Sequence, residues 1–308
     1  MRLSSKSFRK RAGPNTELHR TPAAAPLSPV SSKSLGNQDH TRHNATRMSN
    51  DLAVAKRCAW PDERYVDLRI RQSGLVQLEE AGTFWLWAWP DLLGWPTGIT
   101  WLFSPGTGRD RWPGDLWGID DSGELVIVET KRSTEPADPF EDFLRLEHRR
   151  SSGEFIPPKL ADIRAHWESL LRGERQFLEL HREALHAGTG KLGLWPGVVP
   201  YSSKRIVVWR WRTLYLERVA PIVTSSSYES AVTAALQRWD NRSMWSPHYV
   251  GLFTVLNSAP PRFSAVGKAC HDQLVAITSP AQVHARAIDC RIVSATQVGI
   301  ECWHLSPD

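Results

Sequence analysis

Two carboxylates and one lysine are spaced so that a β-hairpin would bring them together. Residues 115–131 read DLWGIDDSGELVIVETK, with turn-forming residues between two apolar runs. This pattern predicts a hairpin, in which Gly123 supplies the positive φ that a tight turn needs. Pairing the strands about Ser122 gives three facing pairs: Ile119 with Leu125, Trp117 with Ile127, and Asp115 with Glu129.

The chemistry of this hairpin depends on the end where its strands separate. Residues directly opposite each other have Cβ atoms about 4.5–5.5 Å apart, so Asp115 and Glu129 would be close neighbours. Lys131 lies two residues beyond Glu129 and therefore shares its face of the strand. Like-charged carboxylates repel unless a positive charge sits between them, and a divalent cation is the obvious candidate.

The same residues resemble a known family. Asp115, the Gly-Glu-Leu-Val-Ile-Val strand and Glu129-Thr130-Lys131 are similar to the core of the restriction-endonuclease-like, or PD-(D/E)xK, nuclease superfamily, in its RecB/NucS-like group. The resemblance covers residues 98–132 well, and the order of elements is compatible over about 60–215. It implies a Mg²⁺-dependent endodeoxyribonuclease, a hydrolase that cleaves phosphodiester bonds of DNA, with RNA not excluded as the substrate.

Roles for individual residues follow from this resemblance. Asp115 and Glu129 would hold Mg²⁺ or Mn²⁺, which prefer such hard oxygen ligands, and the metal would activate a water. The backbone carbonyl of Thr130 would coordinate too, and Lys131 would stabilise the developing charge. A lysine beside two carboxylates keeps its positive charge, which favours that role over general-base work. Further candidates are a glutamate on the first helix, Glu80, as a metal ligand, and three arginines as nucleic-acid contacts: Arg109, Arg111 and Arg132.

Other interpretations stay open. The helix after Lys131 lacks the Gln and Tyr that the family often carries, and Pro113 lies two residues before Asp115 rather than next to it. The missing Gln and Tyr, together with the unassigned glutamate of the first helix, favour a catalytically inactive nucleic-acid-binding or assembly module with the same fold, whereas the presence of Asp115, Glu129 and Lys131 argues against it. A third interpretation is a tryptophan-rich structural protein whose hairpin carries only a surface ion pair, which stabilises a fold little.

The segments around the hairpin predict the layers that would position it. Apolar spacing predicts helices over 62–81, 140–149, 159–186 and about 227–239, and strands over 84–89, 100–103, 205–216, 249–256, 283–293 and 297–304. This order predicts an α/β fold, a restriction-endonuclease-like mixed β-sheet core flanked by helices, with additional C-terminal strands. Aromatic and arginine residues alternate over 209–212, which fits base stacking or, as we favour, a half-buried strand.

Charge and composition divide the chain of 308 residues. Residues 1–50 hold nine Lys or Arg and two Asp or Glu, which accounts for the net charge of +5. Residues 1–47 are poor in aromatic residues and predict a disordered basic tail, either an untranslated extension before Met48 or an arm that contacts nucleic acid. We expect residues 48–220 to form the nuclease-like core and residues 221–308 an α+β extension packed on it.

The remaining composition sets broad limits. The four cysteines show no zinc-binding spacing, and no apolar run reaches the ~18 residues that a membrane span needs. The N-terminus has no apolar segment of the kind found in signal peptides. These observations predict a cytoplasmic protein that does not associate with membranes, and they leave a homodimer open.

Overall fold

The computed structural model describes residues 52–61, 80–105, 112–132, 139–189, 212–241, 245–256, 289–295 and 298–305. The predicted basic tail, the predicted helix up to residue 79, Arg109, Arg111, residues 205–211 of the predicted strand and residues 283–288 lie outside these ranges. The elements in chain order are β1 (Leu52–Ala59), α4 (Glu80–Ala88), β2 (Ile99–Phe103), β3 (Leu116–Asp120), β4 (Leu125–Arg132), α5 (Pro139–Ser151), α6 (Leu160–Ala187), α8 (Arg212–Leu214), the π-helical turn η1 (Tyr215–Val219), α9 (Ala220–Val223), α10 (Ser226–Asp240), β5 (His248–Leu256), β6 (Asp289–Ala295) and β7 (Gly299–Leu305).

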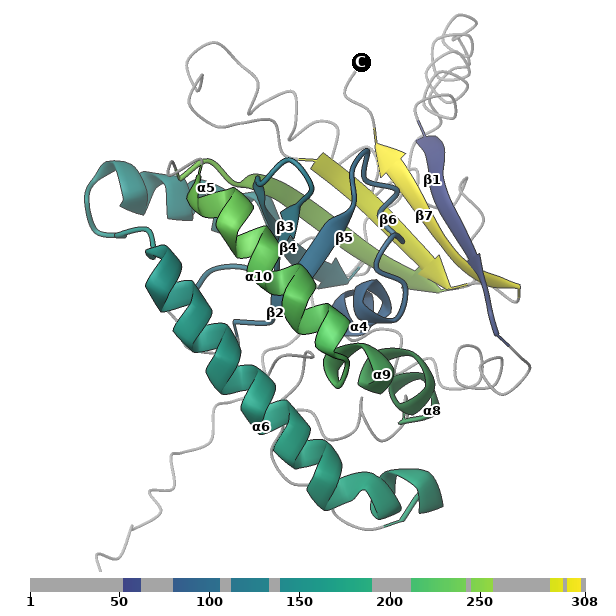
Figure 1. Cartoon of the computed structure of the whole chain (residues 1–308). Helices are drawn as coiled ribbons and strands as arrows, with labels where there is room; N and C mark the ends of the chain where they lie inside the picture. The colour runs from purple at the N-terminus through teal and green to yellow at the C-terminus, as the bar shows by residue number, and fades with distance from the viewer. Residues whose placement is uncertain are drawn as a thin grey trace, which may run out of the picture. The chain divides into compact units, whose positions relative to one another are not determined.

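One mixed sheet of seven strands organises these elements, in the order β1-β7-β6-β5-β4-β3-β2 (Figure 1). Strands β4, β5 and β6 are parallel neighbours, and every other neighbouring pair is antiparallel. The predicted α/β class with a mixed sheet flanked by helices is therefore confirmed. The C-terminal strands continue this sheet from β4 outward, and the domain boundary expected between residues 220 and 221 stays a prediction.

The predicted hairpin is formed by β3 and β4. Its ladder pairs Leu116 with Val128, Trp117 with Ile127 and Ile119 with Leu125, which is the register expected from the sequence. The turn between the strands closes with an amide hydrogen bond from Gly123 to the carbonyl of Asp120 at 2.9 Å, and Gly123 has φ +84°. Four consecutive residues of β4, 125–128, are buried, as expected for a strand in the middle of a sheet.

The helices cover the two faces of the sheet differently. The α4 helix packs on the face that carries Thr130 and Leu252, because a Cβ at Gly82 would meet the side chains of both. The α5 helix packs on the other face, where the Phe143 ring lies 4.6 Å from the ring of Tyr249. Figure 1 shows α10 crossing in front of β3. The α6 helix contacts both β2 and α10, and its Trp167 packs against Tyr228 of α10.

The strand predicted over 84–89 is wrong, since residues 80–88 form helix α4. All eight residues from Gly82 to Trp89 are buried. A helix that is apolar on every side shows no 3.6-residue period, and a short apolar run of this kind cannot be distinguished from a buried strand by pattern alone. Tertiary burial on all sides therefore hides the helix from the sequence pattern.

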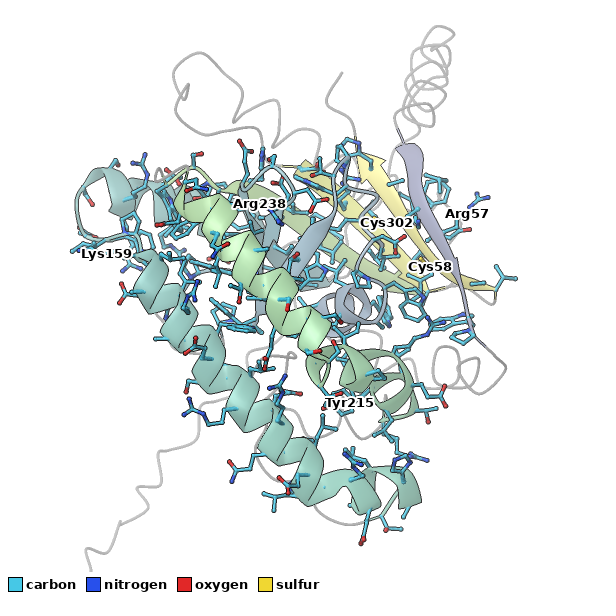
Figure 2. The ribbon with its side chains drawn as sticks, in the orientation of Figure 1. Arg57, Cys58, Lys159, Tyr215, Arg238 and Cys302 are labelled. Atoms are coloured by element: carbon cyan, nitrogen blue, oxygen red, sulfur yellow. The ribbon has the colours of Figure 1, made fainter. Side chains whose placement is uncertain are left out.

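The strand predicted over 205–216 is also wrong in its described part, residues 212–216, which is helical. Tyr215 begins the π-helical turn and is labelled in Figure 2. Its hydroxyl donates a 3.1 Å hydrogen bond to the carboxyl group of Glu174, a fully buried residue of α6. Burial, together with this carboxyl group, raises the pKa of Tyr215 well above its usual value. Docking on α6 thus selects the helical conformation for this segment.

The other predictions of elements are largely confirmed. Seven elements have the predicted type and lie close to the predicted residues: β2, α5, α6, α10, β5, β6 and β7. The segment predicted over 159–186 forms one helix, α6. The core is rich in indole rings, and eight tryptophans of the described ranges are buried: Trp60, Trp85, Trp87, Trp89, Trp101, Trp117, Trp167 and Trp303. These rings fill the space between the sheet and its helices, which explains much of the tryptophan content.

Candidate active site at the open end of the hairpin

The carboxylate of Asp115 lies at the open end of the hairpin, one residue before β3. Its backbone amide donates to the carbonyl of Val128 at 2.7 Å, and its Oδ2 accepts a 2.8 Å hydrogen bond from the amide of Thr130. The ladder itself ends at the Leu116–Val128 pair, so Asp115 joins β4 through its backbone bond to Val128 and its side-chain bond to Thr130, without a ladder pair to Glu129. The result is a carboxylate fixed beside the residue that follows Glu129.

A glycine before Asp115 lets the chain approach β4 closely. Gly114 has φ +83°, a conformation that side chains rarely adopt, and a Cβ there would overlap Cγ2 of Ile127. The indole nitrogen of Trp117 donates a 2.5 Å hydrogen bond to the carbonyl of Pro113, which holds the preceding loop against β3. The sequence Pro113–Gly114 therefore turns the chain so that Asp115 enters the sheet at this point.

Glu129 is a buried carboxyl group with a shifted pKa. The residue is 9% exposed. Burial, followed by the negative charge of Asp115, raises the pKa of Glu129 from its ordinary value of 4.5 to about 8, although Lys131 opposes the change. A carboxylic acid kept neutral by burial and by a second carboxylate near pH 7 is a typical property of functional sites. A cation at this position would relieve the repulsion.

Lys131 lies between two acidic side chains. Its Nζ is 2.5 Å from Oε1 of Glu129 and 3.4 Å from Oδ2 of Asp142. Asp142 is in the first turn of α5, so this helix supplies a third carboxylate on the face that carries Glu129 and Lys131. The side chain of Lys131 is only 13% exposed, so water screens its contacts less than it screens those of a surface ion pair.

The same helix makes a further contact on this face of the sheet. The hydroxyl of Tyr249 in β5 donates to Oε1 of Glu147, and Arg150 contacts the other carboxylate oxygen of Glu147 at 2.8 Å. Burial and then the hydrogen bond with Glu147 raise the pKa of Tyr249 far above its usual value, so the phenol stays protonated. This network fixes α5 against β5 and thereby fixes the position of Asp142.

The first described helix lies on the opposite face. Glu80 is the first residue of α4, and Gly82, two residues later, packs on the Thr130 side of β4. Side chains at 129 and 131 point away from that face because of the period of two. The helix that faces Glu129 is therefore α5, and the acidic residue that it supplies is Asp142.

The donor set matches a hydrated divalent cation better than a closed metal cage. The hydrogen bonds with Thr130 and Lys131 involve one carboxylate oxygen of each residue, Oδ2 of Asp115 and Oε1 of Glu129. Asp115, Glu129 and Asp142 do not form a group of three ligand atoms within 4.8 Å of one another in the described part of the chain. Mg²⁺ commonly binds through one or two carboxylates and keeps several waters, so two carboxylates are sufficient.

The predicted site residues fall into two groups. The structure brings together Asp115, Glu129, Thr130 and Lys131. Arg132 ends β4 and Glu80 begins α4, but their side chains, like the whole of Arg109 and Arg111, lie outside what the structure describes. Sequence reasoning gave no role to Asp142, although an acidic residue in the first turn of the following helix was the available signal.

Comparisons with known proteins do not assign the chain to a family. No protein-family model matches it, and neither a curated protein nor a solved structure does. Within the described residues, no helix combines the length and apolar character that crossing a membrane requires.

Proposed function

We propose that this protein is a metal-dependent nuclease that hydrolyses phosphodiester bonds of DNA at the Asp115–Glu129–Lys131 site, on a restriction-endonuclease-like fold. The observation that carries the proposal is the geometry of the hairpin end, where Oδ2 of Asp115 accepts a hydrogen bond from the Thr130 amide and Oε1 of Glu129 lies 2.5 Å from Nζ of Lys131. Burial and the charge of Asp115, which raise the pKa of Glu129, are consistent with this arrangement. Two carboxylates that repel each other across a hairpin end form a site that gains stability by binding a cation. The resemblance to the PD-(D/E)xK superfamily supplies the substrate class.

Each group has a role in this proposal. Asp115 and Glu129 would hold Mg²⁺ or Mn²⁺, with the Thr130 carbonyl as a further ligand. Such an ion, when bound, lowers the pKa of a coordinated water and screens the negative charge of a phosphate. Lys131 donates hydrogen bonds to the developing negative charge, and Asp142 orients the Lys131 ammonium group through their 3.4 Å contact.

The described charges near the site are compatible with a polyanionic substrate. Arg145 follows Asp142 by three residues on α5, and its side chain is 60% exposed, with one guanidinium nitrogen 3.4 Å from Asp142. Arg149 and Arg150 lie in the last turn of the same helix. Guanidinium groups suit phosphate recognition because they present several donors in one plane. We infer that α5 supplies cations that contact the DNA backbone.

The proposal is tested by cleavage of supercoiled plasmid and of single-stranded DNA by the purified full chain, with Mg²⁺, Mn²⁺ or a chelator. We expect DNA cleavage to require the metal. Glu129→Gln or Lys131→Ala should each lower the cleavage rate on the order of 10²–10³-fold, as for other groups that stabilise transition-state charge. Glu154→Gln, which changes an exposed carboxylate outside the site, is the matched control. Equal metal-dependent cleavage by wild type, Glu129→Gln and Lys131→Ala would exclude this site.

A second candidate is a catalytically inactive DNA-binding or assembly module with the same fold. The close contact of Lys131 with two carboxylates favours it, since an ammonium group held by its neighbours is less available to a phosphate. This candidate predicts DNA binding without cleavage under every metal condition. A gel-shift titration beside the cleavage assay separates the two functions.

A further inference from the structure

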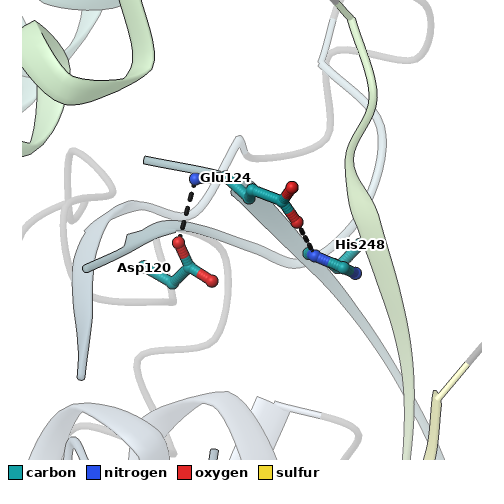
Figure 3. A group of neighbouring side chains, drawn as sticks. All are labelled: Asp120, Glu124 and His248. Atoms are coloured by element: carbon teal, nitrogen blue, oxygen red, sulfur yellow. Dashed lines mark hydrogen bonds and ion pairs between the residues drawn. The ribbon is translucent and has the colours of Figure 1, made fainter. Parts of the chain in front are cut away.

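A second group of ligand-type side chains lies at the closed end of the same hairpin. Asp120 ends β3, Glu124 immediately precedes β4, and His248 begins β5. One ligand atom from each residue lies within 4.8 Å of the other two, and the described residues hold no other such group of three His, Cys, Asp or Glu. Figure 3 shows the three side chains directed toward one another, and the buried residues 125–128 separate them from Glu129.

We propose that Asp120, Glu124 and His248 bind a divalent transition-metal ion of the Zn²⁺ class, at a site distinct from the carboxylates of the open end. An imidazole nitrogen with two carboxylate oxygens is a donor set that suits Zn²⁺ better than Mg²⁺. Three protein ligands leave at least one coordination position for water. The proposal does not depend on the nuclease function.

The Asp120 carboxylate is oriented by its neighbours as a metal ligand would be. Its Oδ1 accepts hydrogen bonds from the Ser122 amide at 2.9 Å, the Ser122 hydroxyl at 2.6 Å and the Glu124 amide at 2.9 Å. Its Oδ2 has a longer contact, 3.4 Å, with the indole nitrogen of Trp95. Hydrogen bonds from neighbouring groups that orient a ligating carboxylate are typical of the outer shell of metal sites.

The strand register places the other two ligands on one face. His248 is paired with Val126 in the parallel β4–β5 ladder, and Glu124 precedes Val126 by two residues. Because side chains alternate along a strand, Glu124 and His248 point to the same side. Nε2 of His248 contacts Oε2 of Glu124, and the imidazole packs edge-on against Trp95 with ring centres 5.5 Å apart. Trp95 therefore contacts two of the three proposed ligands.

An ion could reach this site from solvent. The side chains of Glu124 and His248 are 22% and 34% exposed, whereas Asp120 is buried beneath them. The competing explanation is a turn closed by Asp120 and a hydrogen bond between Glu124 and His248 that joins β4 to β5. That explanation predicts stabilisation by His248 without any effect of zinc, so zinc binding discriminates between the two.

The experiment starts from the full chain after treatment with a chelator. ZnCl₂ is added in a titration, unbound zinc is removed by gel filtration, and the zinc that stays with the protein is measured by mass spectrometry. Glu124→Gln and His248→Gln should each bind one equivalent less than wild type, or bind it at least about tenfold more weakly. Glu154→Gln, which changes an exposed carboxylate outside both proposed sites, should bind as wild type does. Because other histidines and cysteines can bind zinc, the difference between wild type and variant is the measured quantity.

A spectrum identifies the ligand type. Co²⁺ in place of Zn²⁺ should give visible bands without thiolate-to-metal charge transfer, and Glu124→Gln should lose them. Far-ultraviolet circular dichroism establishes that each variant is folded, and if His248→Gln fails to fold, Glu124→Gln alone decides. Equal zinc binding by wild type and Glu124→Gln, absence of zinc binding in wild type, or loss of the zinc in Glu154→Gln would overturn the proposal.

Discussion

The amide of Thr130 donates a 2.8 Å hydrogen bond to the side chain of Asp115, so a carboxylate extends the pairing of β3 with β4 beyond the last ladder pair, at the open end of the hairpin. This bond holds the negative charge of Asp115 next to Glu129, and that charge helps to raise the pKa of Glu129. The consequences for the charge of Glu129 and for its surroundings can be measured without any assumption about the substrate.

The stability of the metal-free protein should fall as pH rises through the range in which Glu129 titrates. The pKa of Glu129 is about 8 in the folded protein and 4.5 ordinarily, so the folded chain holds a proton that the unfolded chain has lost. The free energy of unfolding therefore decreases between about pH 4.5 and about pH 8, by up to a few kcal/mol from this group. Glu129→Gln lacks this titration, and its advantage over wild type should grow between those pH values in urea unfolding. Parallel curves for the two proteins would contradict the assignment.

Two substitutions around Glu129 should move its pKa in opposite directions. Asp115→Asn removes a negative charge and should lower the pKa of Glu129. Lys131→Met removes the cation that favours the ionised carboxylate and should raise it further. Carbon-13 NMR of the labelled glutamate carboxyl group, followed through a pH titration, gives both values. Shifts of the same sign would mean that the charges of Asp115 and Lys131 do not act as described.

The packing of α4 on β4 should be intolerant of a single methyl group. A Cβ at Gly82 would lie 2.7 Å from Cγ2 of Thr254 and 2.8 Å from Cγ2 of Thr130. Gly82→Ala should therefore destabilise the protein by roughly 1–3 kcal/mol, although alanine is the better helix former. The midpoint of urea unfolding is the measurement. Because Thr→Ser removes the obstructing methyl group, adding Thr130→Ser and Thr254→Ser to Gly82→Ala should recover part of the lost stability. An increase in stability from Gly82→Ala alone would contradict the described packing.

The hydroxyl of Tyr228 should matter for the strand β2. It donates to the carbonyls of Trp101 and Leu102 at 3.1 and 3.2 Å and accepts from the indole nitrogen of Trp167 at 3.3 Å. Tyr228→Phe removes the shared partner of these buried groups and should cost about 1–3 kcal/mol of stability. Amide exchange of β2 should accelerate more than that of β6, which Tyr228 does not contact. Exchange that is unchanged in β2 would show that α10 does not anchor this strand.

The hairpin could be predicted from the sequence because its determinants are local. Gly123, the turn residues and two apolar runs fix the register of β3 against β4 without reference to the rest of the chain. Asp142 could not be assigned in the same way, since its contact with Lys131 depends on how α5 packs on the sheet. The proposed zinc ligands share this difficulty, because His248 is 124 residues from Glu124 and only the β4–β5 pairing brings them together.

The errors in the predicted elements have a common origin. Phe84 and Trp87 look like strand residues because every side of α4 is buried, and Tyr215 looks like one because aromatic and β-branched neighbours are typical of strands. In both segments, contacts with distant residues decide the backbone conformation. Strand β1, which the sequence pattern did not indicate, is an edge strand that depends on β7 for its pairing.

The position of β1 has a consequence for the order in which the sheet is completed. Leu52, near the beginning of the described chain, pairs with Leu305, near its end. During synthesis on the ribosome, β1 therefore emerges first but has no strand to pair with until the last described residues have left the exit tunnel. The β3–β4 hairpin can form early from neighbouring residues, whereas the β1 edge closes only after β7 has left the exit tunnel.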